Sequence, residues 1–243
     1  MKKFYLLLIL LLLILTTGLK PASSTSDNGI ILTWSSSSFV PLWYPGKPLP
    51  SSGSQITVSA SPEILLQGTN LRPHNLTYRW FLDYRLQNAA SGQGQQDFSF
   101  IASGSNGTII NIKVEIYNPA GVLLGGKSLK ITLAEPTVQI HHLFENQFIG
   151  TAFKNAAEIK PGQNISFIVI PYFFNIISSE QLDFLWHTNN NPVFPDPNKR
   201  PNIAHLEINP EMPLGSIYDL QVTIKNKFKE KESASNFLRI NIK

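Results

Sequence analysis

The chain of 243 residues contains no cysteine, only 2 methionines and few charged side chains. Without cysteine it can form no disulfide or thiolate metal site, and no lipid can be attached to a cysteine after an export signal. A domain above about 100 residues can bury enough apolar surface to fold without disulfides. The stability of this chain must therefore come from hydrophobic cores.

Charge is also scarce. Charged residues make up 15% of the chain, against roughly 25% in ordinary soluble domains. The net charge is +4 and falls to +2 when Lys2 and Lys3 are set aside. This balance is not that of a nucleic-acid-binding protein. The polar surface must consist of Ser, Asn, Gln and Thr, which hydrogen-bond well but attract charged ligands weakly.

Only one long hydrophobic run occurs, and it stands at the start of the chain. Lys2 and Lys3 precede the Leu/Ile run Leu6–Leu15, and the small residues Thr16–Gly18 follow it, which is the pattern of a secretory signal. The 12 apolar residues Phe4–Leu15 fall short of the roughly 20 that span a bilayer. We expect residues 1–18 to be a cleaved signal peptide and 19–28 a flexible leader. The alternative is an uncleaved signal-anchor helix. Either one places the protein outside the cytoplasm, secreted or on the cell surface.

The rest of the chain contains an internal repeat. The block GSQITV at Gly53 returns as GQNISF at Gly162, 109 residues later. Further pairs keep the same order at offsets between 106 and 109: Leu76, Tyr78 and Trp80 with Leu182, Phe184 and Trp186; residues 111–116 with 219–224; residues 129–131 with 238–240. A repeat of about 110 residues has the size of a complete domain. We predict tandem domains over residues 29–134 and 135–243, joined at Glu135-Pro136.

Apolar and polar residues alternate through both predicted domains, as they do in strands that bury one face. Examples are residues 56–60, 110–116, 165–169 and 218–224, and turn-forming clusters such as residues 67–70 and 118–121 separate the runs. No window after the signal has a helical period. About seven short antiparallel strands per domain is typical of a β-sandwich. The predicted fold is therefore all-β: two tandem antiparallel immunoglobulin-like β-sandwiches behind an N-terminal signal or anchor helix.

Two aromatic triplets carry a family resemblance. Tyr78–Trp80 and Phe184–Trp186 match the third strand of bacterial immunoglobulin-like domains, and Gly92–Gly94 with the aromatic residues 98 and 100 matches the segment that follows. With these motifs, residues 30–243 resemble such domains, closest to the PKD type. The Asp-Phe-Gly-Asp-Gly turn of PKD domains is replaced by Phe81–Asp83 and by residues 187–189. The resemblance implies a spacer, adhesion, carbohydrate-contact or protein-contact module, and no catalysis.

Tryptophans supply both the predicted core and the predicted binding surface. Trp80 and Trp186 alternate in phase with other apolar residues, so we expect each to be buried between two sheets. The second group consists of Trp34, Phe39, Trp43 and Tyr44 among four prolines, and it has no counterpart in the second domain. Exposed aromatics on such a loop can stack on sugar rings or anchor a protein partner. The alternative is that this segment packs as the first edge strand and its loop against the base of domain one.

Other polar groups give weaker signals. His141 and His142 with Glu145 do not predict a metal site, because adjacent residues on a strand point to opposite faces. Asp183, Asp196 and Asp219 lack the spacing of a calcium loop. Residues 225–231 (KNKFKEK) are expected to form a solvated hairpin tip, with weak attraction to an anionic envelope surface as the alternative. Asn75, Asn106 and Asn164 begin N-glycan acceptor patterns, which we discount because the signal and the domain style look bacterial.

These patterns favour a non-enzymatic interaction module that meets a surface protein or glycan through its loops. We expect no catalytic residue, cofactor, metal or nucleic acid. Contact with a membrane is expected only through an uncleaved N-terminal segment. A nucleophile elbow, a phosphate-binding Gly loop and an H-E-x-x-H helix are absent from the sequence. The competing hypothesis is a membrane-anchored spacer or envelope assembly component without a ligand of its own.

Overall fold

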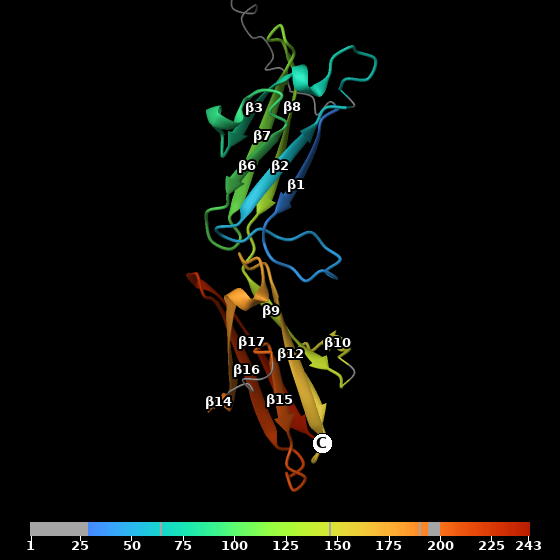
Figure 1. The fold of residues 1–243 in the computed structure, drawn as a ribbon, viewed down its shortest axis with the longest axis vertical. Coiled ribbons are helices and arrows are strands. Elements are labelled where there is room, and N and C mark those ends of the chain that lie inside the picture. Colours follow the sequence, from blue (N-terminus) through green and yellow to red (C-terminus); the bar gives the residue numbers. More distant parts are fainter. Residues whose placement is uncertain (1–28, 64, 146, 190, 194–199) are drawn as a thin grey trace, which may run out of the picture.

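The computed structural model describes residues 29–63, 65–145, 147–189, 191–193 and 200–243, which form two β-sandwiches stacked end to end (Figure 1). The predicted signal or anchor helix and the leader, residues 1–28, lie outside the described residues. No described helix is long and apolar enough to cross a membrane. The only helical elements described are three short 3-10 turns: η1 (Pro73–Asn75), η2 (Asn88–Ala90) and η3 (Ser179–Gln181). The all-β prediction is confirmed.

The first sandwich is built from two sheets. The smaller has the order β1 (Ile31–Ser36), β2 (Gln55–Ser61), β6 (Asp97–Ile101). The larger has the order β4 (Arg85–Leu86), β3 (Thr77–Leu82), β7 (Ile109–Tyr117), β8 (Leu123–Thr132), with β5 (Gly92–Gln93) paired to β3. All the pairs are antiparallel.

The second sandwich repeats this plan. One sheet has the order β10 (Ile149–Ala152), β9 (Thr137–Leu143), β12 (Asn164–Tyr172), β15 (Ile203–Glu207). The other has the order β11 (Ala156–Ile159), β17 (Lys229–Ile242), β16 (Ile217–Asn226), β13 (Leu182–Thr188), β14 (Asn191–Val193). The expectation that every strand is antiparallel was wrong for one pair, because β11 runs parallel to β17. Alternation reports which face of a strand is buried and says nothing of its direction.

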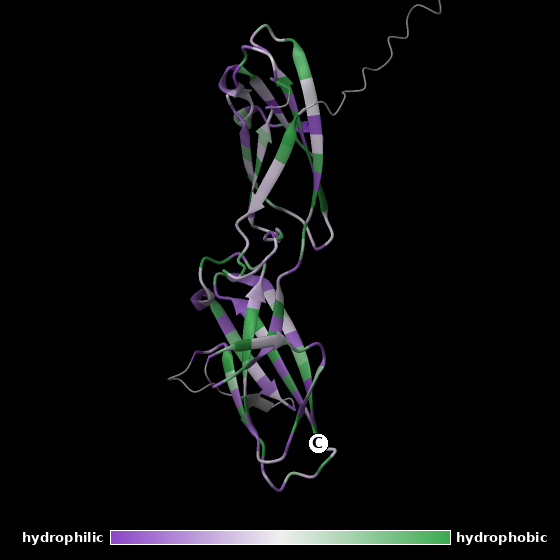
Figure 2. Ribbon diagram, turned by 90° about the vertical axis from the view of Figure 1, so that its right-hand side faces the viewer, coloured by the Kyte–Doolittle hydropathy of each residue, from purple (hydrophilic) through white to green (hydrophobic). Residues whose placement is uncertain are grey.

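The alternation seen in the sequence becomes the inner and outer faces of these sheets. In β7 the even-numbered residues from Ile110 to Ile116 are buried, and the odd-numbered ones are half-buried or exposed. Figure 2 shows the same change of hydropathy along the strands of both sandwiches. The buried residues form a separate core in each sandwich. Each repeat therefore has its own hydrophobic stabilisation.

The two tryptophans occupy the same place in each core. Trp80 is 0% exposed and Trp186 is 1% exposed. The Trp80 Nε1–H donates to Gln95 O at 2.9 Å, and the Trp186 Nε1–H donates to Pro201 O at 3.0 Å, 15 residues ahead in both cases. A buried indole N–H usually has a hydrogen-bond partner. The repeat thus preserves the ring together with its acceptor.

The turn that departs from the PKD pattern is also repeated. The Asn111 N–H donates to Asp83 Oδ1 at 2.9 Å, and the Asp219 N–H donates to Asn189 Oδ1 at 2.9 Å. Asp83 and Asn189 both have positive φ, 45° and 47°, a conformation that Asn and Asp tolerate better than other side-chain residues. The same turn is kept, although the carboxylate and the amide have exchanged places.

Candidate functional site at the waist

The loop between β1 and β2 joins the two sandwiches. We call residues 37–54 the strap and the region where the sandwiches meet the waist (Figure 1). The Phe39 N–H donates to Phe174 O at 2.7 Å, and the Phe173 N–H donates to Phe39 O at 2.6 Å. The Phe39 side chain packs against the core of the second sandwich. A segment of the first repeat therefore completes the packing of the second.

Polar contacts reinforce the strap. Asn175 Nδ2 donates to Ser51 Oγ at 3.1 Å and to Ser52 O at 2.9 Å. The Asn175 N–H donates to Glu232 Oε1 at 2.8 Å, which ties the same residue to β17. The Ala134 N–H donates to Pro50 O at 2.8 Å, so the strap also holds the chain that leads into β9. These bonds attach the strap to the second sandwich and to the chain segment that leads into it.

The strap covers an apolar patch on the outer face of a sheet. Residues 167–172 of β12 are all buried, so this strand is covered on both sides. On its outer side Ile168, Ile170 and Tyr172 form a third cluster, against which Val40 and Tyr44 of the strap pack. The unbroken apolar run at residues 167–174 is a sequence signal for a strand buried on both faces. It indicates that the outer face of this strand is covered, but not which segment covers it.

The four aromatic residues of the predicted binding surface have different surroundings. Trp34 is half-buried on β1, and Lys47 Nζ lies 4.4 Å from the centroid of its ring. Phe39 is half-buried against the second core. Tyr44 packs edge-on against Tyr172 and Phe173, with ring centroids 5.7 and 5.9 Å apart. The alternative that the segment packs against the base of domain one was therefore wrong for Phe39 and Tyr44, which pack on the second sandwich.

Trp43 is the member of the group that faces solvent, with 54% of its surface exposed. It borders a hollow of about 330 Å³ that Tyr44, Pro45, Thr137, Gln139, Tyr172 and Phe173 also line. Burial raises the pKa of Tyr172, and the neighbouring Tyr44 adds to this effect. A Cβ at Gly46 would lie 2.9 Å from the Tyr44 ring, so any other residue there would displace the ring. The hollow is a mixed aromatic and neutral polar surface.

His141 lies beneath Trp43, with ring centroids 6.3 Å apart. Its Nδ1 is 2.9 Å from Gly150 O, and a carbonyl can only accept, so Nδ1 carries the proton. The buried Nε2 has no hydrogen-bond partner among the described residues. His142 points the other way, with its ring tilted against that of Phe144 and the ring centroids 3.9 Å apart, and burial lowers its pKa. The two histidines lie on opposite faces, and no described group of three or more His, Asp or Glu could hold a metal ion.

One histidine has a partner that the sequence did not indicate. His205 Nδ1 and Ser166 Oγ lie 2.6 Å apart, directly opposite each other in the β12–β15 register. The pair is on the exposed outer face of the sheet, and cross-strand hydrogen bonds of this kind stabilise sheets. The two residues are 39 positions apart in the sequence, and only the register of their strands brings them together. Spacing along the sequence could not show it.

The acidic residues considered for calcium do not gather. Asp183 faces Lys227 at 3.8 Å, and Asp219 lies 3.4 Å from Arg239 farther along the same sheet. Asp196 lies outside the described residues. The lysine-rich segment 225–231 forms the β16–β17 hairpin end, as predicted, and Phe228 at its tip is exposed. Lys229 of this tip lies 3.5 Å from Gly53 O of the strap.

Comparison with known proteins gives resemblance in fold alone. No family model matches the sequence, and no curated protein matches it. Among solved structures, the fibronectin(III)-like modules of Clostridium thermocellum CbhA align at 11% identity and TM-score 0.29, over 88% of this chain and 94% of that one. The tandem Ig repeats of Dlar align at 8% identity and TM-score 0.28, over 89% and 98%. The ICAM-5 D1–D4 ectodomain fragment aligns at 12% identity and TM-score 0.30, over 88% and 53%.

These neighbours are tandem domains of the immunoglobulin and fibronectin III classes. The sheets and cores described above make the present chain a tandem of all-β sandwiches. The PKD subtype and the domain limits at residues 134 and 135 stay predictions.

Proposed function

We propose that this protein is a non-enzymatic, exported interaction module that contacts a surface glycan or protein at the waist. The observation that carries the proposal is Trp43, a large aromatic exposed at the rim of a hollow that belongs to neither core. An exposed aromatic next to a polar rim is a common anchor in recognition. The protein would act outside the cytoplasm, secreted or held at the cell surface, as a bacterial adhesion module of the kind that the resemblance implies.

The lining of the hollow favours a neutral, hydroxyl-rich ligand such as a glycan. Thr137 and Gln139 offer uncharged donors and acceptors beside the rings of Trp43 and Tyr172. Flat rings with a few neutral polar groups suit a sugar, which has apolar C–H faces and hydroxyl edges.

The strap gives this surface a fixed geometry. Two backbone hydrogen bonds and an aromatic contact hold the strap against the second sandwich. A preorganised site binds more tightly, because less conformational entropy is lost on binding. The module would thus present the hollow without first having to order its loops.

Replacing one exposed aromatic tests the proposal. Trp43→Ala in the full chain should weaken attachment to cells, or to glycans on an array, several-fold, because the aromatic anchor is lost. The melting temperature should stay within a few degrees, since surface changes alter stability by at most about 0.5 kcal/mol. Leu42→Ala is the matched control, since Leu42 is the adjacent, fully exposed residue and does not line the hollow. Equal attachment of the Trp43 variant and the wild type would contradict the proposal.

The strap also favours a second candidate, the membrane-anchored spacer or envelope assembly component without a ligand. In that case Phe39 and Tyr44 would serve only to stiffen the rod, and the N-terminal segment would remain as an anchor. Fractionation separates the two. A mature protein that begins near Leu19 and binds cells supports the module, whereas an intact chain found only in membranes, with no ligand bound, supports the spacer.

A further inference from the structure

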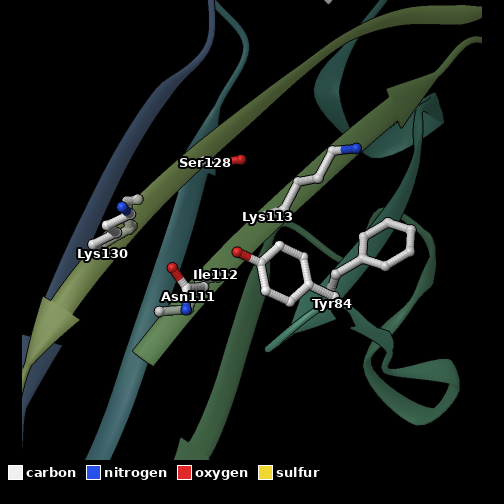
Figure 3. A pocket seen from close by; sticks show the side chains of 8 residues that line it. Tyr84, Asn111, Ile112, Lys113, Ser128 and Lys130 are labelled. Atoms are coloured by element: carbon white, nitrogen blue, oxygen red, sulfur yellow. The ribbon is translucent and has the colours of Figure 1, made fainter. Parts of the chain in front are cut away.

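A second hollow lies on the outer face of the larger sheet of the first sandwich, away from the waist. It has a volume of about 530 Å³, within the range of small-ligand sites. Figure 3 shows the ring of Tyr84 in front of β7, with side chains from β7 and β8 around it. The outward-facing lining residues are Phe81, Tyr84, Asn111, Lys113, Ser128 and Lys130. It therefore combines aromatic rings, an amide, a hydroxyl and two ammonium groups.

The identity of Tyr84 is not required by the fold. Asp83 and Tyr84 form the two-residue turn between β3 and β4, with φ of 45° and 67°, and such a hairpin turn needs positive φ at both positions and favours Asn or Gly there. A bulky tyrosine is strained in this conformation, and its side chain is 85% exposed. At the repeat offset of 106 the second copy has Asn190, a residue type that tolerates the conformation. The tyrosine is thus specific to the first repeat.

The charges around the hollow also differ between the repeats. In the second sandwich Asp219 and Arg239 face each other across β16 and β17 and form an ion pair at 3.4 Å. In the first sandwich the corresponding cross-strand pair is Asn111 and Lys130. Here an amide stands where the second copy has a carboxylate, and Lys130 forms no ion pair with any described residue. A carboxylate supplied by a ligand would complete the pair that the second copy makes internally.

The other lining cation is already paired. Lys113 Nζ lies 2.7 Å from Glu115 Oε1, and the Tyr117 hydroxyl donates to Glu115 Oε2 at 2.8 Å. The nearby Asp83 Oδ1 accepts from the backbone and side-chain nitrogens of Asn111 at 2.9 and 3.3 Å. Lys130 is therefore the lining cation that has no ion pair with a described residue.

The position of the hollow favours a saccharide over a peptide. It lies over β7, whose backbone is hydrogen-bonded to β3 on one side and to β8 on the other. A peptide that adds to a sheet needs a free strand edge, which β7 does not have. Recognition here must come from side chains: a ring face for the sugar ring, an amide and a hydroxyl for its hydroxyls, and a cation for an acidic group.

We propose that this hollow binds a uronic-acid residue of an acidic polysaccharide. The Tyr84 ring stacks on the sugar, Lys130 pairs with its carboxylate, and Asn111 and Ser128 hydrogen-bond its hydroxyls. The site is separate from Trp43 and does not rest on the function proposed for the waist.

Titration of the full chain with oligosaccharides tests the proposal. The probes are trimers of galacturonate, glucuronate and mannuronate, with maltotriose as the neutral control and hexaglutamate as an acidic peptide. We expect at least one uronate trimer to bind, more weakly as salt is raised, and maltotriose to bind at least tenfold more weakly. Lys130→Gln and Tyr84→Asn should each reduce uronate affinity at least tenfold, and Lys130→Arg should restore it.

Two variants serve as matched controls. Arg239→Gln removes the corresponding cation of the second repeat, and Trp43→Ala alters only the waist, so both should bind uronate as the wild type does. Melting curves of every variant establish that it is folded. Failure of all three uronates to bind at low salt, or unchanged affinity in Lys130→Gln, would overturn the proposal. So would equally tight binding of hexaglutamate, which would point to an acidic peptide as the ligand. If a glycan binds the wild type but not the Trp43 variant, and the Lys130 and Tyr84 variants still bind it, that glycan binds at the waist and not in this hollow.

Discussion

At the scale of single residues, Trp80 and Trp186 make the largest contribution to their separate cores. Each is fully buried, with its N–H bonded to a carbonyl. Replacing either with alanine should cost about 3–5 kcal/mol, because a large cavity forms and the carbonyl loses its donor. Urea unfolding of the two variants measures this cost. A loss below 1 kcal/mol in either one would contradict the role of its indole in the core.

Strain at Tyr84 gives a prediction of the opposite sign. A non-glycine residue in the left-handed region costs about 1–2 kcal/mol, and asparagine is among the few residues that visit it routinely. Tyr84→Asn should therefore raise the melting temperature or leave it unchanged, although the same variant loses ligand in the hollow. Tyr84→Phe is the matched control, because it keeps the strain and should melt as the wild type does. A clear destabilisation by Tyr84→Asn would show that the ring supports the fold.

A pH dependence follows from Glu115. Burial alone would raise the pKa of this carboxyl, but hydrogen bonds from Lys113 and Tyr117 and the charges of Lys113 and Arg79 outweigh it and lower the pKa. A carboxyl with a lowered folded-state pKa stabilises the protein above its unfolded pKa, and this stabilisation is lost as the pH falls through the folded pKa.

Lys113→Met should thus reduce the free energy of unfolding near pH 7, by no more than about 1 kcal/mol because Lys113 is partly exposed. The reduction should shrink as the pH falls through the folded-state pKa of Glu115, because the protonated carboxyl no longer attracts Lys113. Lys130→Met is the control on the same face and should show no such dependence. Chemical unfolding over a series of acidic pH values measures both variants, and a loss that does not change with pH would contradict the assignment.

At the scale of elements, the strap is where the stability of one repeat depends on the other. Phe39→Ser keeps the backbone bridge to Phe174 but removes an aromatic side chain from the second core. It should lower the stability of the second sandwich by about 1–3 kcal/mol, although the residue belongs to the first repeat. Fluorescence of Trp186, in a background where Trp34, Trp43 and Trp80 are replaced by Phe, reports that sandwich. Unchanged unfolding would mean that Phe39 only rests on the surface.

The strands were largely predictable and the strap contacts were not. Alternation of side chains is a local property, so β7 and β16 could be located from their own residues, and the tryptophans from their phase with Leu76 and Leu182. The partner of Tyr44 lies more than 120 residues ahead at Tyr172, and no local pattern encodes such a contact. The hollow beside Tyr84 could not be predicted either. It depends on the backbone conformation of a turn and on strand register, neither of which can be read from spacing along the chain.

At the scale of the whole molecule, two cores and one shared waist predict coupled unfolding. Sandwiches with separate cores should give two calorimetric transitions, but whichever sandwich unfolds first also loses the waist contacts. In Trp80→Ala the first sandwich should melt early. The second should then melt no higher than it does in Phe39→Ser, because it has lost the Phe39 side chain together with the other waist contacts. A single transition, shifted equally by Trp80→Ala and Trp186→Ala, would mean one fused core.

The waist has a mechanical consequence. The sandwiches are connected through the polypeptide at residues 133–137 and, beside it, through the Phe39–Phe174 bridge, and Figure 1 places the C-terminus at the end of the rod far from the first sandwich. Two attachment points oppose rotation about every axis except the line that joins them, whereas a single point would leave all rotations free. A sideways force at Lys243 that acts about any other axis would therefore rotate both sandwiches together through nearly the same angle.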